Sequence, residues 1–220
     1  MATSDSIVLY DFFASNCAWR VRNVLHWKGI PYETRSVNLL AGEQHKPAFL
    51  KINPYGAVPV LYIDNRFITQ SVAICEYLDE TRPEKRVFPE DPYEKAQVRR
   101  IVEIINSYLV PLQNPTTAKK HSNDPEEQLA WSMDFFTKGF TVVEKLLAET
   151  SGRYSVGDDV TFADMALVPQ VWRAKRLKPD FSRFPNIMRV YKELLQLEAF
   201  GKAHAANHKD CPEDIRGDVC

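Results

Sequence analysis

The hydrophobic pattern of this chain changes once, in the proline-containing stretch between residues 81 and 93. Before it, short apolar segments rich in β-branched and aromatic residues alternate with segments of helical periodicity. After it, apolar residues recur only at helical spacing. Because strands and helices bury their apolar faces with different periods, this change predicts a small α/β part followed by an all-helical part.

The first 80 residues are predicted to form seven elements in the order βαβαββα. The strands are expected at 7–12, 32–37, 58–63 and 66–69, and the helices at 17–28, 41–51 and 71–80. Gly29 is a natural residue to end the first helix, and Asp64-Asn65 predicts a two-residue hairpin. The early β-α-β unit predicts parallel strands in a covered sheet, to which the hairpin adds an antiparallel strand.

The stretch from Thr81 to Tyr93 carries three prolines and several charges, which is typical of a linker. Beyond it, apolar stripes predict long helices over 98–112 and 133–147, and further helices over 162–174 and 184–196. We expect one domain over residues 1–83 and a second over 92–220. Residues 205–220 are polar and are expected to form an irregular tail.

Composition excludes several classes of protein. Nothing in a net charge of −1 over 220 residues suggests the concentrated basic face that nucleic-acid binding needs. No signal peptide and no apolar run of about 20 residues is visible, so neither secretion nor a membrane is expected. The four cysteines are scattered without a C-x-x-C pair, which favours reduced thiols in the cytoplasm.

The segment from Ser15 to Arg22 lies between a predicted buried strand and a predicted helix. A thiolate at a helix start is stabilised by the unpaired amides and the helix dipole. That thiolate can belong to Cys17 or to a bound thiol, to which the Ser15 hydroxyl can donate. The alternative is that Ser15 only caps the helix while Cys17 fills space.

The segment from Asn53 to Leu61 places Pro59 at the start of a predicted strand. We predict a cis Val58–Pro59 bond, which would leave the Val58 backbone able to pair with an extended peptide ligand. An ordinary trans proline is the alternative.

Gln70 and Ser71 precede an apolar helical segment, and Ser71 is predicted to be its N-cap. A ligand carboxylate can lie on the exposed amides of such a helix start. A plain cap without a ligand is the alternative.

Four stretches together resemble the zeta class of the glutathione transferase superfamily, the class that includes maleylacetoacetate isomerase. They read S-x-C-x-W-R-V-R at 15–22, N-P-x-x-x-V-P-x-L at 53–61, Q-S-x-A-I-x-E-Y-L at 70–78 and V-G-D-D-V-T-F-A-D at 156–164. In the last stretch, Thr161 and Asp164 form a predicted capping box. The resemblance runs from about residue 7 to about residue 205.

The resemblance implies a thioredoxin-like N-terminal domain, an all-helical C-terminal domain, and glutathione as the cofactor. It implies catalytic roles for Ser15 and Cys17. The residues implied to contact glutathione are Ser15, Asn16, Cys17, Arg20, Gln44, Val58, Gln70 and Ser71. Gln113 and Arg176 are implied to meet an acidic substrate. For Arg176 the alternative is a solvated surface arginine, which the sequence alone favours.

The chain departs from the family pattern at two positions before the cysteine. The family usually has an arginine followed by two serines, whereas this chain has Ala14, Ser15 and Asn16. Ala14 removes a positive charge, and Asn16 changes the reach of a hydrogen-bond donor. We expect glutathione binding to survive both changes, and the preference for a dicarboxylate substrate to be the property they put in question.

The resemblance implies a glutathione-dependent cis–trans isomerase of maleylacetoacetate-like substrates that forms a homodimer in the cytoplasm. A glutathione-conjugating transferase or α-haloacid dehalogenase is the enzymatic alternative, and a non-catalytic glutathione-binding scaffold protein is the third. His204, His208 and Cys211 are spaced like metal ligands but lack a fourth partner, so no metal is expected.

Overall fold

The computed structural model describes residues 6–216, which form two compact units. The first unit comprises Met1–Arg86 and Leu197–Cys220, and the second comprises Val87–Gln196. The chain therefore leaves the first unit, builds the second, and returns to the first. The second domain expected from the sequence, residues 92–220, differs from the second unit because it included the residues from Leu197 onward, which belong to the first unit.

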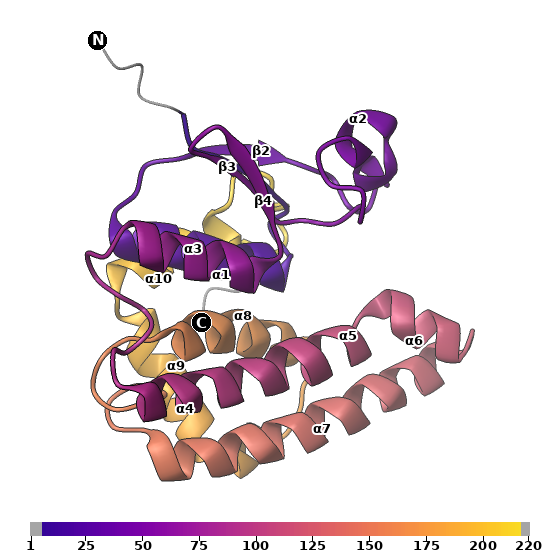
Figure 1. Cartoon of the computed structure of the whole chain (residues 1–220). Coiled ribbons are helices and arrows are strands. Elements are labelled where there is room, and N and C mark those ends of the chain that lie inside the picture. Colours follow the sequence, from indigo (N-terminus) through magenta and orange to yellow (C-terminus); the bar gives the residue numbers. More distant parts are fainter. Residues whose placement is uncertain (1–5, 217–220) are drawn as a thin grey trace. The chain divides into compact units, whose positions relative to one another are not determined.

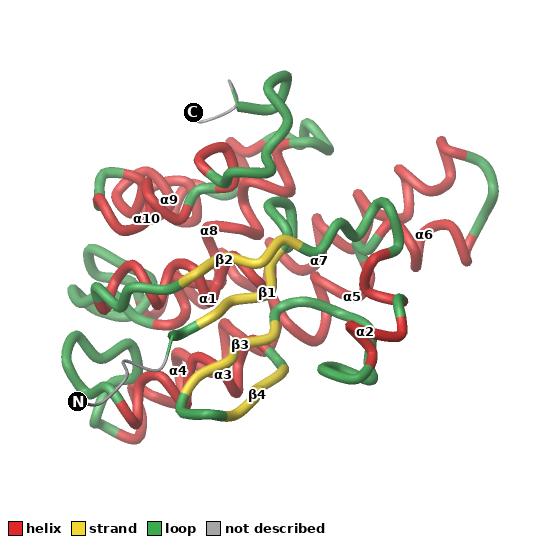
Figure 2. The backbone as a smooth tube through the Cα atoms, turned by 90° about the horizontal axis from the view of Figure 1, so that it is seen from above, coloured by secondary structure: helices red, strands yellow, loops and turns green. Residues whose placement is uncertain are grey.

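A four-stranded sheet forms the centre of the first unit, in the order β2-β1-β3-β4 (Figure 2). The strands are β1 Val8–Asp11, β2 Glu33–Ser36, β3 Val60–Ile63 and β4 Arg66–Thr69. β1 pairs with β2 in parallel, whereas β3 is antiparallel to both β1 and β4. The two apolar strands lie in the middle, with Leu9 opposite Leu61, and the polar segments form the edges.

Two helices, α1 Asn16–Lys28 and α3 Ser71–Thr81, lie together on one face of this sheet (Figure 1). α1 follows the prediction closely and ends at Gly29, whose φ of 68° lies in the left-handed region. The Gly29 N–H donates to the carbonyls of His26 and Leu25, which closes the last turn. The βαβαββα order is confirmed.

The single helix predicted over 41–51 is wrong. The chain forms a 3₁₀ turn at Glu43–His45 and then a separate short helix, α2, at Pro47–Leu50. Pro47 has no N–H and occupies the first turn of α2, while Lys46 before it is extended. Proline starts a helix well but cannot continue one, so the periodic pattern is interrupted here.

The carboxyl-terminal residues pack on the first unit. α10 Glu198–Ala203 contacts α1, and a 3₁₀ turn follows at Ala205–Asn207. Apart from this turn, residues 205–216 form no helix or strand, as expected for an irregular tail, and residues 217–220 of that tail lie outside the described residues. The expectation of a polar segment missed Ala205, Ala206 and Cys211, which are buried. Because most residues of this segment are polar, its few small apolar residues were not recognised in the sequence as buried.

Helices build the second unit. They are α4 Pro92–Glu103, a π-helical segment η2 Ile104–Leu109, α5 Val110–Leu112, α6 Pro115–His121, α7 Pro125–Thr150, α8 Phe162–Lys175, a 3₁₀ turn η3 Phe181–Arg183, and α9 Pro185–Leu195. α4 packs against α8, and α7 packs against α9 and η2. The stripe predicted from Val98 to Leu112 is buried as far as Leu109, and Leu112 is half-buried. Nowhere in residues 6–216 is a helix both long and apolar enough to cross a membrane.

At Gly139, α7 packs directly against Leu109 of the π-helical segment. A Cβ at this position would overlap the side chain of Leu109, which is fully buried. The absence of a side chain at residue 139 is therefore what lets the two segments pack together.

The predicted capping box at the start of α8 is confirmed. The Asp164 carboxylate accepts the N–H of Thr161 at 2.7 Å and that of Ser155 at 2.9 Å. Burial raises the pKa of Asp164, and its hydrogen bonds oppose that rise. The Asp164 carboxylate thus caps the start of α8 and also fixes the preceding loop at Ser155.

Candidate functional site

Ser15 lies at the junction of β1 and α1 and caps the helix. Its φ and ψ are −78° and 109°, and its Oγ accepts the N–H of Ala18 at 3.2 Å. A hydroxyl that accepts in a cap still has its own hydrogen to donate. Capping and donation to a ligand are therefore compatible roles for Ser15, which is half-buried.

Cys17 lies in the first turn of α1 and is also half-buried. That turn contains no acidic residue, so no side chain there offsets the positive end of the helix dipole. The neighbouring Asn16 is buried. The start of α1 is thus suited to an anion.

A buried ion pair, Asp11 with Arg22, holds the β1–α1 turn in place. Arg22 Nη1 donates to both carboxylate oxygens of Asp11, at 2.7 and 2.9 Å, and Nη2 donates to the carbonyl of Phe13 at 3.1 Å. Its Nε donates to the carbonyl of Ala203 at 3.0 Å. One guanidinium therefore connects the end of β1, the turn before Ser15, and the carboxyl-terminal segment.

The pKa of Asp11 is lowered from its ordinary value. Burial is the largest influence and acts to raise this pKa, but Arg22 and a hydrogen bond from His208 together outweigh it. The distance from His208 Nε2 to Asp11 Oδ2 is 3.2 Å. Asp11 is therefore held ionised inside the first unit.

Arg20 is fully buried, and its Nη1 donates to Ser71 Oγ at 3.4 Å. This bond joins α1 to the start of α3, so two of the three motifs of the first domain meet directly. Because Arg20 is buried among protein atoms, it helps to position the start of α3 relative to α1.

The start of α3 differs from the prediction in one detail. Ser71 is the first helical residue, and Gln70 is the N-cap, so the prediction of Ser71 as the cap is wrong. Gln70 is exposed and has a φ of 70°, which is strained for a residue other than glycine. Such strain concentrates at ligand sites, and it makes Gln70 a stronger candidate for a ligand contact.

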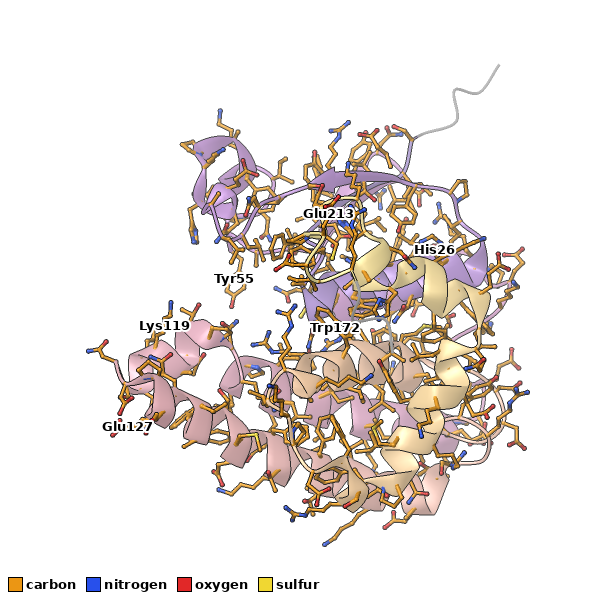
Figure 3. The ribbon with its side chains drawn as sticks, turned by 180° about the vertical axis from the view of Figure 1, so that it is seen from behind. His26, Tyr55, Lys119, Glu127, Trp172 and Glu213 are labelled. Atoms are coloured by element: carbon orange, nitrogen blue, oxygen red, sulfur yellow. The ribbon has the colours of Figure 1, made fainter. Side chains whose placement is uncertain are left out.

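The loop before β3 is shaped by Asn53, which is buried. Its Nδ2 donates to the carbonyl of Ala57 at 2.7 Å, and its Oδ1 accepts the N–H of Tyr55 at 3.1 Å. Tyr55 itself projects from this loop (Figure 3). The predicted cis Val58–Pro59 bond is confirmed.

Gln44 lies in the 3₁₀ turn before α2 and is half-buried. Its Nε2 donates to the carbonyl of Leu39 at 3.4 Å and lies 3.2 Å from His45 Nε2. Gly56, with a φ of 66°, packs against Gln44 and His45. The structure thus brings the turn of Gln44 to the loop that leads to Val58.

The two residues implied to meet the substrate belong to the second unit. Gln113 is buried at the end of α5, and its Oε1 accepts from Gln170 Nε2 at 2.6 Å. Arg176 ends α8 and is exposed, with its guanidinium carbon 4.6 Å from the centre of the Trp172 ring. Figure 3 shows Trp172 on α8.

The chain matches known proteins along most of its length. "Glutathione S-transferase, N-terminal domain" matches residues 9–86, and "Glutathione S-transferase, C-terminal domain" matches residues 116–198. Maleylacetoacetate isomerase of Mus musculus is 45% identical over 211 residues, 95% of this chain and 97% of that protein. The holo structure of a maleyl pyruvate isomerase, described as a bacterial zeta-class glutathione S-transferase, has a TM-score of 0.89 and 35% identity, and the match covers 93% of this chain and 100% of that one. The chain belongs to the zeta-class glutathione transferase family.

The zeta-class chain is also similar to the crystal structure of maleylacetoacetate isomerase from Anaeromyxobacter dehalogenans 2CP-1, which has glutathione bound in its active site. It is 37% identical, with a TM-score of 0.86 over 94% of this chain and 98% of that one. The glutathione transferase fold predicted from the sequence is confirmed by these matches and by the βαβαββα unit followed by helices.

The histidines and cysteine near the end of this zeta-class chain have other partners. His204 Nδ1 accepts the N–H of Ala206, His208 contacts Asp11, and Cys211 lies near the carbonyl of Pro212. Within residues 6–216, no three His, Cys, Asp or Glu side chains are grouped so that they could hold a metal ion.

Sequence reasoning missed the Asp11–Arg22 pair. Two signals were present: a carboxylate at the end of an otherwise apolar strand, and an arginine on a helix whose neighbours Val21 and Val24 are fully buried. Both charges had to lie inside the fold, and a buried charge needs a partner.

Proposed function

We propose that this chain is a glutathione-dependent cis–trans isomerase of maleylacetoacetate-like substrates. The observation that carries the proposal is the position of Ser15: half-buried at the start of a 13-residue helix, with a hydroxyl hydrogen that the cap does not use. The two relatives named as maleylacetoacetate isomerases support the choice of reaction.

The residues of the first unit fit glutathione in the following roles. Ser15, Asn16 and Cys17 face the thiol at the start of α1, while Gln70 and Ser71 offer the start of α3 to a carboxylate. The Val58 backbone and Gln44 hold the peptide part. Arg20 contributes by fixing Ser71.

The chemistry that glutathione would supply when bound is the addition of its thiolate to one carbon of the double bond, which leaves a single bond between the two carbons, permits rotation about it, and is reversed by elimination of the thiolate. Ser15 donates its hydroxyl hydrogen to the sulfur anion. Hydrogen bonds to charged groups contribute roughly 1.5–3 kcal/mol, which lowers a thiol pKa by about one to two units. The dipole of α1 acts in the same direction.

Cys17 has a supporting role in this proposal. Its S–H donates only weakly, and its thiolate would repel that of glutathione. It shapes the pocket from the first turn of α1. Gln113 and Arg176 are the proposed contacts of the acidic substrate.

The test compares Ser15→Ala with Ser15→Thr and Cys17→Ala, using maleylacetone as substrate with catalytic glutathione. Ser15→Ala removes the donor, so kcat should fall at least ten-fold and the pKa of bound glutathione should rise. Ser15→Thr keeps both a hydroxyl and a cap and should retain most of the activity. Cys17→Ala should mainly weaken binding.

Two results would overturn the assignment. If Cys17→Ala abolished turnover while Ser15→Ala left it intact, a thiol-exchange mechanism would replace isomerisation. If calorimetry at millimolar glutathione showed no binding, the glutathione site itself would be rejected, whereas binding without turnover of any substrate would identify a non-catalytic glutathione-binding scaffold protein.

A glutathione-conjugating transferase or α-haloacid dehalogenase is the second candidate, favoured by Ala14 and Asn16, where the family pattern has arginine and serine. A chloroacid assayed beside maleylacetone separates the two reactions, because the dehalogenase releases chloride and the isomerase does not. The faster of the two, compared by kcat/KM, identifies the function.

We also propose that the chain is a homodimer in the cytoplasm, as expected from the family resemblance. Light scattering at micromolar concentration should give twice the 25.3 kDa mass of the chain. A monomeric mass would refute the dimer, and fractionation of the native cells tests the location.

A further inference from the structure

The first unit contains a cavity at the opposite end of α1 from Ser15. Its volume is about 270 Å³, and its walls come from α1, the β2 segment, α10 and the residues that follow α10. His26, in the last turn of α1, lies beside α10 (Figure 3). Pockets for drug-sized ligands occupy about 300–1,000 Å³. This cavity therefore suits a small ion or a ligand of few heavy atoms.

The polar lining of the cavity is basic. Six lining residues carry, or can carry, a positive charge: Arg22, His26, Lys202, His204, His208 and Lys209. In the part of the chain that the structure describes, no Asp or Glu lines the cavity. Asp11, Glu198 and Asp210 are close to it only as partners of Arg22, Lys202 and His208. The cavity itself thus offers positive charge without a carboxylate of its own.

The guanidinium of Arg22 is already occupied. Each of its three nitrogens donates within the protein, to Asp11 and to the carbonyls of Phe13 and Ala203. The planar fork that would suit a carboxylate is therefore not offered to a ligand. The cations left for a ligand are the two lysines.

Lys202 and Lys209 bring their ammonium groups from two different segments. Lys209 Nζ donates to the carbonyl of Thr34 at 2.8 Å, which uses one of its three N–H groups. It forms no ion pair with a carboxylate of residues 6–216. Lys202 Nζ lies 2.6 Å from Glu198 Oε1, but both side chains are mostly exposed, and such pairs are weak. Both ammonium groups can therefore turn to a bound anion at little cost.

His26 and Tyr32 form the inner wall. His26 Nε2 lies 3.2 Å from the Tyr32 hydroxyl, and both side chains are half-buried. Burial lowers the pKa of His26, and the charges of Lys202 and Arg22 lower it further. The positive potential of the cavity thus reaches its inner wall, where a bound anion would oppose it.

Helix dipoles explain only part of this arrangement. A basic residue in the last turn of a helix is favoured by the dipole, which accounts for His26 on α1 and Lys202 on α10. The dipole does not account for Lys209, which lies outside any helix, nor for the meeting of all three in one cavity.

We propose that this cavity binds a small phosphate dianion, either the free ion or the phosphate group of a small monoester. Lys202 and Lys209 approach from different segments, which suits the several oxygens of a phosphate, and lysine binds phosphate as a point charge. The site is independent of the proposed function, because its residues lie at the far end of α1 from Ser15 and its occupation needs no turnover.

The test measures binding of inorganic phosphate to the full chain by calorimetry at constant ionic strength. Lys202→Gln and Lys209→Gln should each weaken binding several-fold, and together at least ten-fold. Lys138→Gln is the matched control, because Lys138 also pairs with a carboxylate four residues before it on an exposed helix face but lies outside the cavity. It should leave the affinity unchanged. Double-variant binding within two-fold of the unaltered chain would overturn the proposal.

Three further measurements identify the ligand and its place. Methyl phosphate that binds at least as tightly as inorganic phosphate assigns a monoester to the cavity, and weaker binding assigns the free ion. Acetate should bind several-fold more weakly than either, and equal affinity would refute the choice of phosphate. Saturating glutathione should leave phosphate affinity unchanged, whereas displacement would place the anion at the start of α1 and reject this site.

Nuclear magnetic resonance gives an independent readout that needs no lysine variant. At fixed pH, phosphate should shift the ring signals of His26, assigned with His26→Gln, and leave those of His121 on α6 in place. Ring signals of His26 that do not move at saturating phosphate would reject the cavity as the binding site.

Discussion

The carboxylate of Asp11 and the guanidinium of Arg22 face each other across the β1–α1 turn, joined by hydrogen bonds of 2.7 and 2.9 Å. Neither side chain is appreciably exposed. Arg22 also holds the carbonyl of Phe13, two residues before Ser15. The position of Ser15, the proposed hydrogen-bond donor to the thiolate, therefore depends on a buried charge pair.

Replacing Asp11 with Asn should destabilise the chain, and the loss should depend on pH. Breaking a buried pair leaves Arg22 uncompensated, which costs about 3–5 kcal/mol. The folded pKa of Asp11 is below its ordinary 3.8. The carboxylate therefore stabilises the fold above about pH 4, and this contribution is lost as the pH falls through the folded pKa.

Urea unfolding at pH 7 and at pH 3 measures this effect. The difference between the unaltered chain and Asp11→Asn should be large at pH 7 and smaller at pH 3. Asp134→Asn, which removes an exposed carboxylate paired with Lys138, serves as the control and should give a small difference at both. A difference for Asp11→Asn that does not change with pH would contradict the assignment.

Asn53→Ala should weaken glutathione binding with little direct loss of ligand contact. The Asn53 side chain holds both Ala57 and Tyr55, so its removal should loosen the loop that ends at Val58. We expect the dissociation constant of glutathione, measured by calorimetry, to rise several-fold. Asn53→Asp keeps the acceptor for Tyr55 but loses the donor to Ala57, so an effect as large as that of alanine would identify the Ala57 bond as the important one. Unaltered affinity in both variants would show that this loop does not serve the ligand.

Gly139→Ala and Gly201→Ala should change stability in opposite directions. At Gly139 the new methyl group overlaps Leu109, and overpacking of this kind costs about 1–3 kcal/mol. At Gly201, inside α10, nothing lies within 4 Å of the added carbon. Alanine there should gain up to about 1 kcal/mol from helix propensity. Thermal unfolding measures both, and equal shifts in the two variants would contradict the close packing of α7 on the π-helical segment.

Asp164→Ala should destabilise the second unit strongly. The substitution leaves the N–H groups of Ser155 and Thr161 without their acceptor, at about 1–3 kcal/mol for each buried donor. Asp159→Ala, an exposed change in the same loop, is the matched control. Urea unfolding that gave the same midpoint for both variants would show that the capping box contributes nothing.

Local rules predicted the elements that depend on local chemistry. The cap at Ser15, the end of α1 at Gly29, and the box at Thr161 and Asp164 each depend on residues within four positions of one another. The stripe from Val98 to Leu109 likewise follows from helical periodicity alone.

The features that were missed join residues far apart in the chain. Arg22 reaches the carbonyl of Ala203, and His208 reaches Asp11, across more than 180 positions. No local pattern signals such partners. The break at Pro47 was missed for a different reason, because the apolar spacing on either side of the proline continued through it.

The return of the chain to its first unit has a consequence for its synthesis. Chains are made from the amino terminus, and domains usually fold as units as they emerge. Here the residues that close the first unit, from Leu197 onward, are translated only after the whole helical unit. Until then, Arg22 lacks the carbonyl of Ala203, and Asp11 lacks His208. On the ribosome, the part of the protein that is made first is therefore the part that is completed last.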